Sequence, residues 1–281
     1  TDTVPFHGPR QAGVDTPAQA HAVFLALDLR EDADRVRIER MLRLLTDDIR
    51  TGTFPISIDS GEIATATQHQ VNALRGAVGS PRHLLLGVDR LDYTKGILQR
   101  LLAIESLLEE GKLDDIAFVQ IATPSRERIE HYRTTRKEVE EAIGRINGRY
   151  GTLGNPVIHY EHQSVPKSTL RDYYSAADIM LVTPFKDGMN LVAKEYVACH
   201  PDGSGALVLS EFAGVAEELD RAHLCNPFDV EAVKGAIVGA VDKQNSLEAR
   251  DAMLAMHAHV MEHDVTRWAD SFLDALREVK R

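Results

Sequence analysis

The chain has 281 residues, of which 43% are hydrophobic and 27% charged, and this suffices for a sizeable core in one large domain or two small ones. Its formal net charge of −11, without a long basic run, argues against nucleic acid and anionic membrane surfaces as partners, so any anion site must be local. Apolar runs stay below the roughly 20 residues that span a bilayer, and the N-terminus lacks a signal-peptide pattern. Cys199 and Cys225 match no metal spacing. These observations together predict a cytoplasmic protein with reduced thiols.

Residues 1–50 are predicted to be an incomplete piece of another structural unit. The stretch "HAVFLALDL" suits either a strand or a helix, whereas "DADRVRIERMLRLLTDDI" has helical periodicity with many charges. The next segment, 51–59, "TGTFPISID", predicts an extended crossing in which Pro55 cannot donate a backbone hydrogen bond. We therefore expect a domain boundary near residue 50, with a single domain over 51–281.

From about residue 80 the pattern alternates between strands and helices. Short, continuous apolar runs are typical of strands buried on both faces, and they occur at 84–88, 117–122, 157–160, 179–183 and 206–210. Helical segments lie between and after them, at 96–110, 127–147, 168–177, 189–199, 229–242 and twice within 247–280, with a break near His263–Asp264. This alternation predicts an α/β fold with a doubly wound, parallel, Rossmann-like sheet, whose ligands bind where strands end and helices begin.

The stretch "LLLGVDRLDYTKG", 84–96, places four charged residues at the end of the first of these strands. Arg90 offers a planar fork of donors and Lys95 a compact charge, and a helix start at Gly96 adds backbone N–H groups. This combination suits a phosphate or diphosphate. The alternative is a surface ion-pair cluster in which Asp89 and Asp92 neutralise the two cations, and spacing alone leaves both interpretations open.

A second polar loop lies in "TPFKDGMNLVAKEYVA", 183–198. Asp187 falls in a glycine-containing turn, and a helix start near Met189–Asn190 would aim the N–H groups of Gly188, Met189 and Asn190 at a ligand. Glu195, about one and a half turns further, could accept two hydrogen bonds from a ribose diol. Alternatively, Asp187 only caps the helix and Glu195 is solvated.

Two other candidates are weaker. The stretch "ATPSRERIEHY", 122–132, predicts Arg126 at the mouth of a helix, where it either holds a second phosphate or is an ordinary surface residue. His259 and His263 are four residues apart, but "HVMEH" does not have the order H-E-x-x-H and lacks a third ligand, so we expect no metal site.

Taken together, "GVDRLDYTKGI", "ATPSRER", "INGRYG", "VTPFKDGMNLVAKEYVA", "LVLSEFAG" and "NPFD" closely resemble the trehalose-6-phosphate synthases, in order, from about Phe54 to the C-terminus. That family transfers glucose with retention from a nucleotide-glucose (UDP-, GDP- or ADP-glucose) to glucose 6-phosphate, in trehalose biosynthesis. The resemblance implies a two-domain GT-B glycosyltransferase, here its C-terminal, donor-binding half. It also favours the anion interpretation of Arg90 and Lys95.

The resemblance further implies roles for individual residues. Arg90 and Lys95 match the pair that grips the diphosphate of the donor and stabilises it as it leaves, and Asp187 matches a residue that hydrogen-bonds the transferred glucose. Glu195 matches the ribose-binding carboxylate, and Arg126 matches an arginine that contacts the phosphate of the acceptor. The rest of the implied donor site is Val165, near the base, and Gly188, Met189, Asn190, Leu191 and Val192, along the loop beside the sugar and diphosphate.

The chemistry implied by the family uses no metal and no other cofactor. Departure of a nucleoside diphosphate develops negative charge, which two fixed cations and helix-terminal N–H groups stabilise most in the transition state. Because no carboxylate nucleophile is evident, the implied route is a front-face one in which the leaving phosphate deprotonates the attacking hydroxyl.

The chain departs from the family in its N-terminal part. "VPFHGPRQAG" resembles a piece of the family's "GFHTPRQA", but the Gly-rich first loop and active-site histidine of that domain have no counterpart, and 11–50 follows the family poorly. Three interpretations follow: part of an ordinary synthase, a truncated module that binds a nucleotide sugar without turnover, or a transferase similar to glucosylglycerol-phosphate synthase. Trp268 and apolar positions on the terminal helices permit a homo-oligomer, and the base of the donor stays open.

Overall fold

A computed structural model describes residues 52–63, 65–125 and 130–279. The chain divides into two compact units, Pro55–Trp268 and a second one made of Thr1–Phe54 with Ala269–Arg281. The predicted remnant, 1–50, lies outside the described residues, so the domain boundary near residue 50 stays a prediction.

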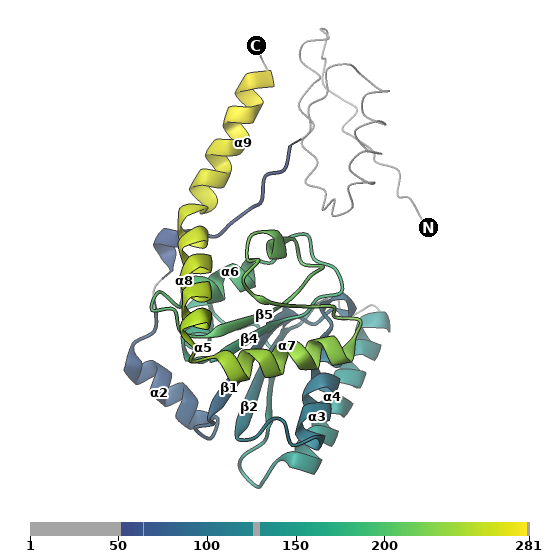
Figure 1. Cartoon of the computed structure of the whole chain (residues 1–281). Helices are drawn as coiled ribbons and strands as arrows, with labels where there is room; N and C mark the ends of the chain where they lie inside the picture. The colour runs from purple at the N-terminus through teal and green to yellow at the C-terminus, as the bar shows by residue number, and fades with distance from the viewer. Residues whose placement is uncertain (1–51, 64, 126–129, 280–281) are drawn as a thin grey trace. The chain divides into compact units, whose positions relative to one another are not determined.

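The larger unit contains a parallel sheet of six strands in the order β3-β2-β1-β4-β5-β6 (Figure 1). The strands are β1 (His83–Arg90), β2 (Ile116–Thr123), β3 (Ile158–Glu161), β4 (Ile179–Val182), β5 (Ala206–Ser210) and β6 (His223–Cys225). The predicted α/β, doubly wound, parallel sheet is therefore confirmed.

Helices cover both faces of the sheet (Figure 1). One face is covered by α3 (Ile97–Glu109), α4 (Glu130–Tyr150) and α7 (Val230–Lys243), and the other by α2 (Gln68–Ala77), α5 (Lys167–Ala176), α6 (Leu191–Ala198) and α8 (Leu247–Glu262). Short 3₁₀ turns η2 (Ser60–Glu62), η3 (Tyr93–Lys95) and η4 (Gly214–Glu217) lie in the connections, and α9 (Val265–Val279) ends the described chain.

Helix α2 was not among the predicted elements. Its signal is a capping box, in which the Thr67 hydroxyl accepts from the N–H of Gln70 while the Gln70 side chain accepts from the N–H of Thr67. The helix buries no residue completely. It therefore lacks the continuous apolar stripe by which the other helices were found.

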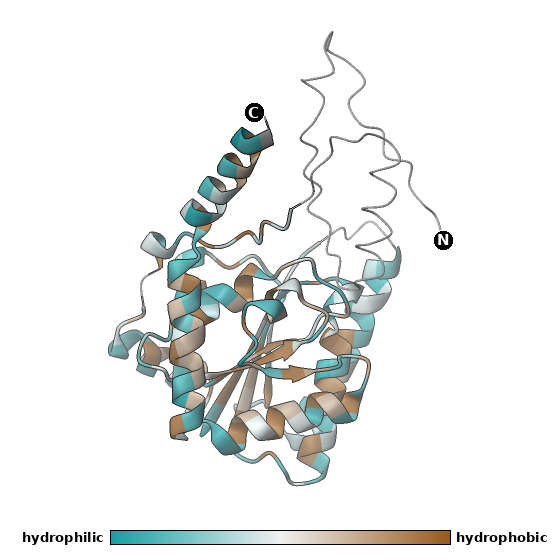
Figure 2. Cartoon of the chain, turned by 45° about the horizontal axis from the view of Figure 1, so that its top comes forward, coloured by the Kyte–Doolittle hydropathy of each residue, from teal (hydrophilic) through white to brown (hydrophobic). Residues whose placement is uncertain are grey.

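Two hydrophobic cores result from the alternation of side chains along the strands. On β1, Leu84, Leu86 and Val88 face the core under α5, α6 and α8, whereas Leu85 faces the core under α3, α4 and α7. Figure 2 shows the strands as the most hydrophobic part of the unit, with hydrophilic residues on the outer faces of the helices. Cys199 and Cys225 are free and buried, one in each core.

The order of the strands reverses between β1 and β4, which are paired neighbours in the middle of the sheet. In doubly wound sheets this point is where the chain leaves adjacent strands in opposite directions and opens a crevice at their carboxyl ends. Arg90 is the last residue of β1, Lys95 lies in η3 directly after that strand, and the loop after β4 carries Asp187. Among the described helices, none is long and apolar enough to cross a membrane.

Candidate functional site

The two aspartates at the end of β1 and just after it, Asp89 and Asp92, form their hydrogen bonds and ion pairs with residues other than Arg90 and Lys95. Asp89 is 7% exposed and accepts from Nη1 of Arg100 at 2.8 Å. Asp92 caps η3 by accepting from the N–H and the hydroxyl of Thr94, and the Tyr132 hydroxyl also donates to it. Burial would raise the pKa of Asp92, but these hydrogen bonds and the Arg90 charge outweigh it and hold the pKa below its ordinary value.

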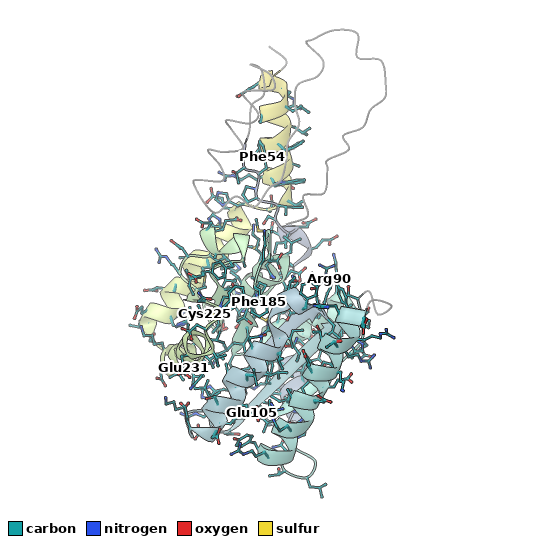
Figure 3. All side chains as sticks on the ribbon, turned by 90° about the vertical axis from the view of Figure 1, so that its right-hand side faces the viewer. Phe54, Arg90, Glu105, Phe185, Cys225 and Glu231 are labelled. Carbon is teal, nitrogen blue, oxygen red and sulfur yellow. The ribbon has the colours of Figure 1, made fainter. Side chains whose placement is uncertain are left out.

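Arg90 and Lys95 both lie at the carboxyl edge of the sheet. Arg90 is exposed at the end of β1 and makes no ion pair with the part of the chain that the structure describes. Lys95 donates to Oδ2 of Asp187 at 2.5 Å, so the cation of one loop contacts the carboxylate of the next. In Figure 3, Arg90 and Phe185 lie toward one end of the sheet, and Glu105 on α3 lies toward the other. The alternative in which Asp89 and Asp92 neutralise Arg90 and Lys95 is therefore wrong. Asp89 pairs with Arg100, and Lys95 pairs with Asp187.

Backbone hydrogen bonds hold the Asp187 loop between its two neighbours. The N–H of Phe185 donates to the carbonyl of Thr94 at 2.8 Å, which ties the loop to η3. The N–H of Asp187 donates to Phe212, and Gly214 donates to the carbonyl of Asp187, which ties the loop to the end of β5. A Cβ at Gly214 would lie 2.1 Å from the carbonyl oxygen of Gly188, so this close approach requires glycine.

Helix α6 begins after Asn190, not within the loop. The Asn190 side chain accepts from the N–H of Ala193 and donates to Oδ2 of Asp187, and its backbone adopts φ 155° and ψ 94°, a conformation rare outside glycine. Leu191 and Val192, which the resemblance assigned to the loop, are the first two residues of the helix and pack against the core. Their N–H groups belong to the helix terminus, where no intrahelical acceptor exists and an anion is favoured.

The predicted base and ribose contacts lie on the same edge. Glu195, on α6, accepts from the Tyr174 hydroxyl of α5 at 2.9 Å, and burial raises the pKa of its carboxyl group. Val165 lies half-buried between β3 and α5, with its side chain against the core. Gly188 is exposed and Met189 half-buried in the loop before α6. Arg126 lies outside the described residues, so its place at an acceptor phosphate stays a prediction.

Metal-binding geometry is absent from the described part of the chain, where no group of three metal-ligating side chains occurs. The His259 and His263 rings stack with their centroids 4.2 Å apart, and Nε2 of His259 is 3.3 Å from Oε2 of Glu218. The same carboxylate oxygen accepts from Lys194 at 2.9 Å. These histidines therefore take part in a structural hydrogen-bond network behind α6.

The site brings together two cations, one carboxylate and a helix terminus at adjacent strand ends. This set can bind an anionic group and a polyhydroxylated group side by side. Tyr174 and Arg100, the partners of Glu195 and Asp89, were not among the predicted site residues. A signal for Arg100 existed, because it is the arginine on the apolar face of 97–107, one residue before the buried Leu101.

Comparisons with known proteins agree with this geometry. The model of glycosyltransferase family 20 matches residues 22–278. The trehalose-6-phosphate synthase of Mycobacterium leprae is 53% identical over 244 residues, which are 84% of this chain and 49% of that protein. The one of Mycolicibacterium vanbaalenii is 54% identical over 235 residues, 81% of this chain and 48% of that protein. The chain thus spans about half the length of the curated relatives it matches.

Solved structures of trehalose-phosphate synthases are also similar to this chain. A UDP-forming α,α-trehalose-phosphate synthase from Burkholderia xenovorans, in complex with glucose-6-phosphate, has a TM-score of 0.74 and 35% identity, covering 82% of this chain and 52% of that one. A protein from E. coli described as trehalose-6-phosphate bound with UDP-2-fluoro glucose has a TM-score of 0.76 and 32% identity, covering 90% of this chain and 60% of that one.

Proposed function

This chain belongs to glycosyltransferase family 20, and from that premise we propose that it is the donor-binding half of an α,α-trehalose-phosphate synthase. The reaction is the retaining transfer of glucose from a nucleotide-glucose to glucose 6-phosphate. The observation that carries the proposal is the pair of strand-end loops at the switch between β1 and β4, with Arg90 and Lys95 on one and Asp187 on the other. The similarity to trehalose-6-phosphate synthases favours this reading over a glycerol-phosphate transferase.

In the proposed complex the diphosphate of the donor lies between Arg90, Lys95 and the first N–H groups of α6. The guanidinium and the ammonium act as charge-assisted donors to the phosphate oxygens, and the helix terminus adds a partial positive charge. Asp187 accepts from hydroxyl groups of the glucose, and Glu195 accepts from the ribose. The Tyr174 hydroxyl donates to Oε2 of Glu195 and fixes the direction of that carboxylate.

During transfer the bond between the anomeric carbon and the β-phosphate oxygen breaks, and the acceptor hydroxyl forms the new bond on the same face. The leaving diphosphate takes the proton of that hydroxyl. Arg90 and Lys95 stabilise the charge that grows on the β-phosphate, which is why they serve catalysis as well as binding. No step of this proposal needs a metal ion.

The acceptor, glucose 6-phosphate, would be held by Arg126 and by the half of the relatives' length to which this chain does not correspond. We also propose that the protein works in the cytoplasm, because two buried free thiols suit a reducing compartment. Burial raises the pKa of Cys199 to about 11 and that of Cys225 to about 12, which keeps both thiols protonated and unreactive.

The test is titration calorimetry of the chain with UDP, GDP and ADP, together with a nucleotide-release assay on the corresponding nucleotide-glucoses. We expect one nucleoside diphosphate to bind with the same affinity in the presence of a chelator, and Arg90→Ala to weaken binding and to lower turnover about 100-fold or more. Arg149→Ala is the matched control, since Arg149 is an exposed arginine near the end of α4 and pairs with Glu109.

The acceptor is tested by adding glucose 6-phosphate or glycerol phosphate to the release assay. Stimulation by glucose 6-phosphate alone supports the synthase, and stimulation by glycerol phosphate alone overturns it. Tight diphosphate binding without release under any condition would mean a binding module. Normal turnover in Arg90→Ala would refute the assigned role of the strand-end cations.

A further inference from the structure

A buried arginine, Arg100, contacts both strand-end loops of the proposed donor site. Arg100, on the first turns of α3, is 0% exposed, although its guanidinium carries a full charge. Its Nη1 donates to Oδ2 of Asp89 and to Oε1 of Gln120, both at 2.8 Å, and its Nε donates to Oγ1 of Thr183 at 3.1 Å. We call these four residues, Asp89, Arg100, Gln120 and Thr183, the Arg100 network.

The network spans three strands and a helix at the carboxyl edge of the sheet. Asp89 is the next-to-last residue of β1, Gln120 lies on β2, and Thr183 directly follows β4. Nη2 of Arg100 also lies 3.5 Å from the carbonyl oxygen of Lys95. One planar guanidinium therefore contacts the residue before Arg90, the backbone of Lys95 and the start of the Asp187 loop.

The surrounding backbone is shaped to admit this guanidinium. A Cβ at Gly87 would lie 2.4 Å from Nη1 of Arg100 and 2.6 Å from Oε1 of Gln120, so only glycine leaves the space. Gln120 is fully buried and completes the network, because its amide nitrogen reaches Asp89 and the carbonyl of Gly87, both at 3.3 Å. A buried charge is tolerated only with partners of this kind.

We propose that Arg100 is a positioning residue for glucosyl transfer, acting through Asp89 and Thr183 to hold the Arg90–Lys95 loop and the Asp187 loop in one fixed relation. This inference rests on the proposed function. Each loop alone supplies groups for one part of the donor, whereas transfer requires the diphosphate and the glucose to be held together. An error of about 1 Å between such groups can cost about a hundredfold in rate.

Substitutions of Arg100 and Thr183 separate positioning of the loops from charge balance. Arg100→Lys keeps the positive charge beside Asp89, but an ammonium has no planar fork and cannot bind Asp89 and Thr183 in the same geometry. Thr183→Val replaces the hydroxyl that joins the network to the second loop with a methyl group, whereas Thr183→Ser keeps the hydroxyl and loses the methyl group. Because the serine variant keeps the hydrogen-bonding group, it is the rescue control.

A backbone amide reports on the two loops independently of catalysis. The N–H of Phe185 donates to the carbonyl of Thr94 across the two loops, and the N–H of Asp178 donates to Leu84 at the opposite edge of the same strand pair, both at 2.8 Å. In Arg100→Lys and Thr183→Val we expect hydrogen exchange at Phe185 to quicken at least tenfold, with exchange at Asp178 unchanged. Thr183→Ser should match the unaltered chain.

The functional readout is kcat for release from the nucleotide-glucose, compared with Kd for the nucleoside diphosphate, well below the melting temperature of each variant. We expect Arg100→Lys to lower kcat about 10- to 100-fold while Kd changes less than about threefold. Normal kcat and normal Phe185 exchange in Arg100→Lys would overturn the proposal, because charge alone would then suffice. So would equal losses in kcat, in diphosphate affinity and in exchange protection at both amides, which indicate general unfolding.

Failure of the proposed function gives a different result. If the unaltered chain neither binds a nucleoside diphosphate nor releases one, the assignment as donor half fails, whatever the variants do. The ratio of exchange at Phe185 to exchange at Asp178 still decides whether Arg100 fixes the two loops.

Discussion

The substitution Asp187→Asn removes the charged partner of Lys95 and is expected to strengthen diphosphate binding while it slows transfer. Lys95 donates to Asp187 at 2.5 Å, and the two side chains are only 11% and 22% exposed. A diphosphate has to draw the ammonium away from this carboxylate. Exposed pairs of this type contribute about 0.2–1 kcal/mol, and the shelter of this one places it near the upper end, so Kd should fall about two- to fivefold.

The effect on transfer has the opposite sign. If Asp187 holds hydroxyl groups of the glucose as a charged acceptor, the neutral amide still accepts but loses the charge assistance, about 1–1.5 kcal/mol, which corresponds to an about five- to tenfold lower kcat. Asparagine keeps the size of the side chain, and Asn190 still has an oxygen to donate to at this position. The assays are titration calorimetry for the diphosphate and initial rates of nucleotide release.

A control for general charge effects is Glu217→Gln, which removes the same charge from an exposed position on η4. It should change neither Kd nor kcat. Diphosphate binding that weakens tenfold or more in Asp187→Asn would refute the reasoning, because Asp187 would then assist the anion site and not compete with it.

Two further outcomes concern stability. Gly96 has φ +63°, and a Cβ there would lie 2.2 Å from the carbonyl oxygen of Thr183. Gly96→Ala should therefore lower the free energy of unfolding by at least about 1–2 kcal/mol, as measured by thermal unfolding. The control Gly235→Ala, in open space on α7, should be neutral or stabilising. Burial lowers the pKa of His200 below 6.5 despite its hydrogen bond to the Tyr196 carbonyl. As the pH falls, the unfolded chain therefore takes up a proton before the folded one does. The free energy of unfolding should drop below pH 6.5 by up to about 1.4 kcal/mol per pH unit. Denaturant titrations of His200→Gln from pH 7.5 to 5 should show a smaller slope of unfolding free energy against pH, by the equivalent of up to one bound proton. An unchanged slope would contradict this role of His200.

The sheet could be predicted from the sequence because its strands are buried on both faces. Such strands appear as continuous apolar runs, and each predicted run became a strand within a few residues. Helix α2 could not be found in this way, since it has polar residues on most sides and its only strong signal is the Thr67–Gln70 capping box. Its existence depends on a local hydrogen-bond pattern and not on hydrophobic periodicity.

The positions of Arg90, Lys95 and Asp187 at strand ends could be predicted from the sequence, but the partners of the charged side chains could not. Neighbouring residues on a strand point to opposite faces, which is why Asp89 turns inward to Arg100 while Arg90 stays exposed. The partner of Lys95 lies 92 positions away on another loop. Contacts of this kind follow from the order of the strands in the sheet, and no local stretch of sequence predicts that order.

The same strand order has a consequence for biosynthesis. A ribosome makes β1, β2 and β3 first, and these can assemble into a half sheet, yet the other edge of β1 has no neighbour until Ile179–Val182 has emerged. An unpaired edge in the middle of an apolar sheet invites association with other nascent chains. A nucleotide could not shield this intermediate, because the proposed pocket is complete only when β4 joins β1.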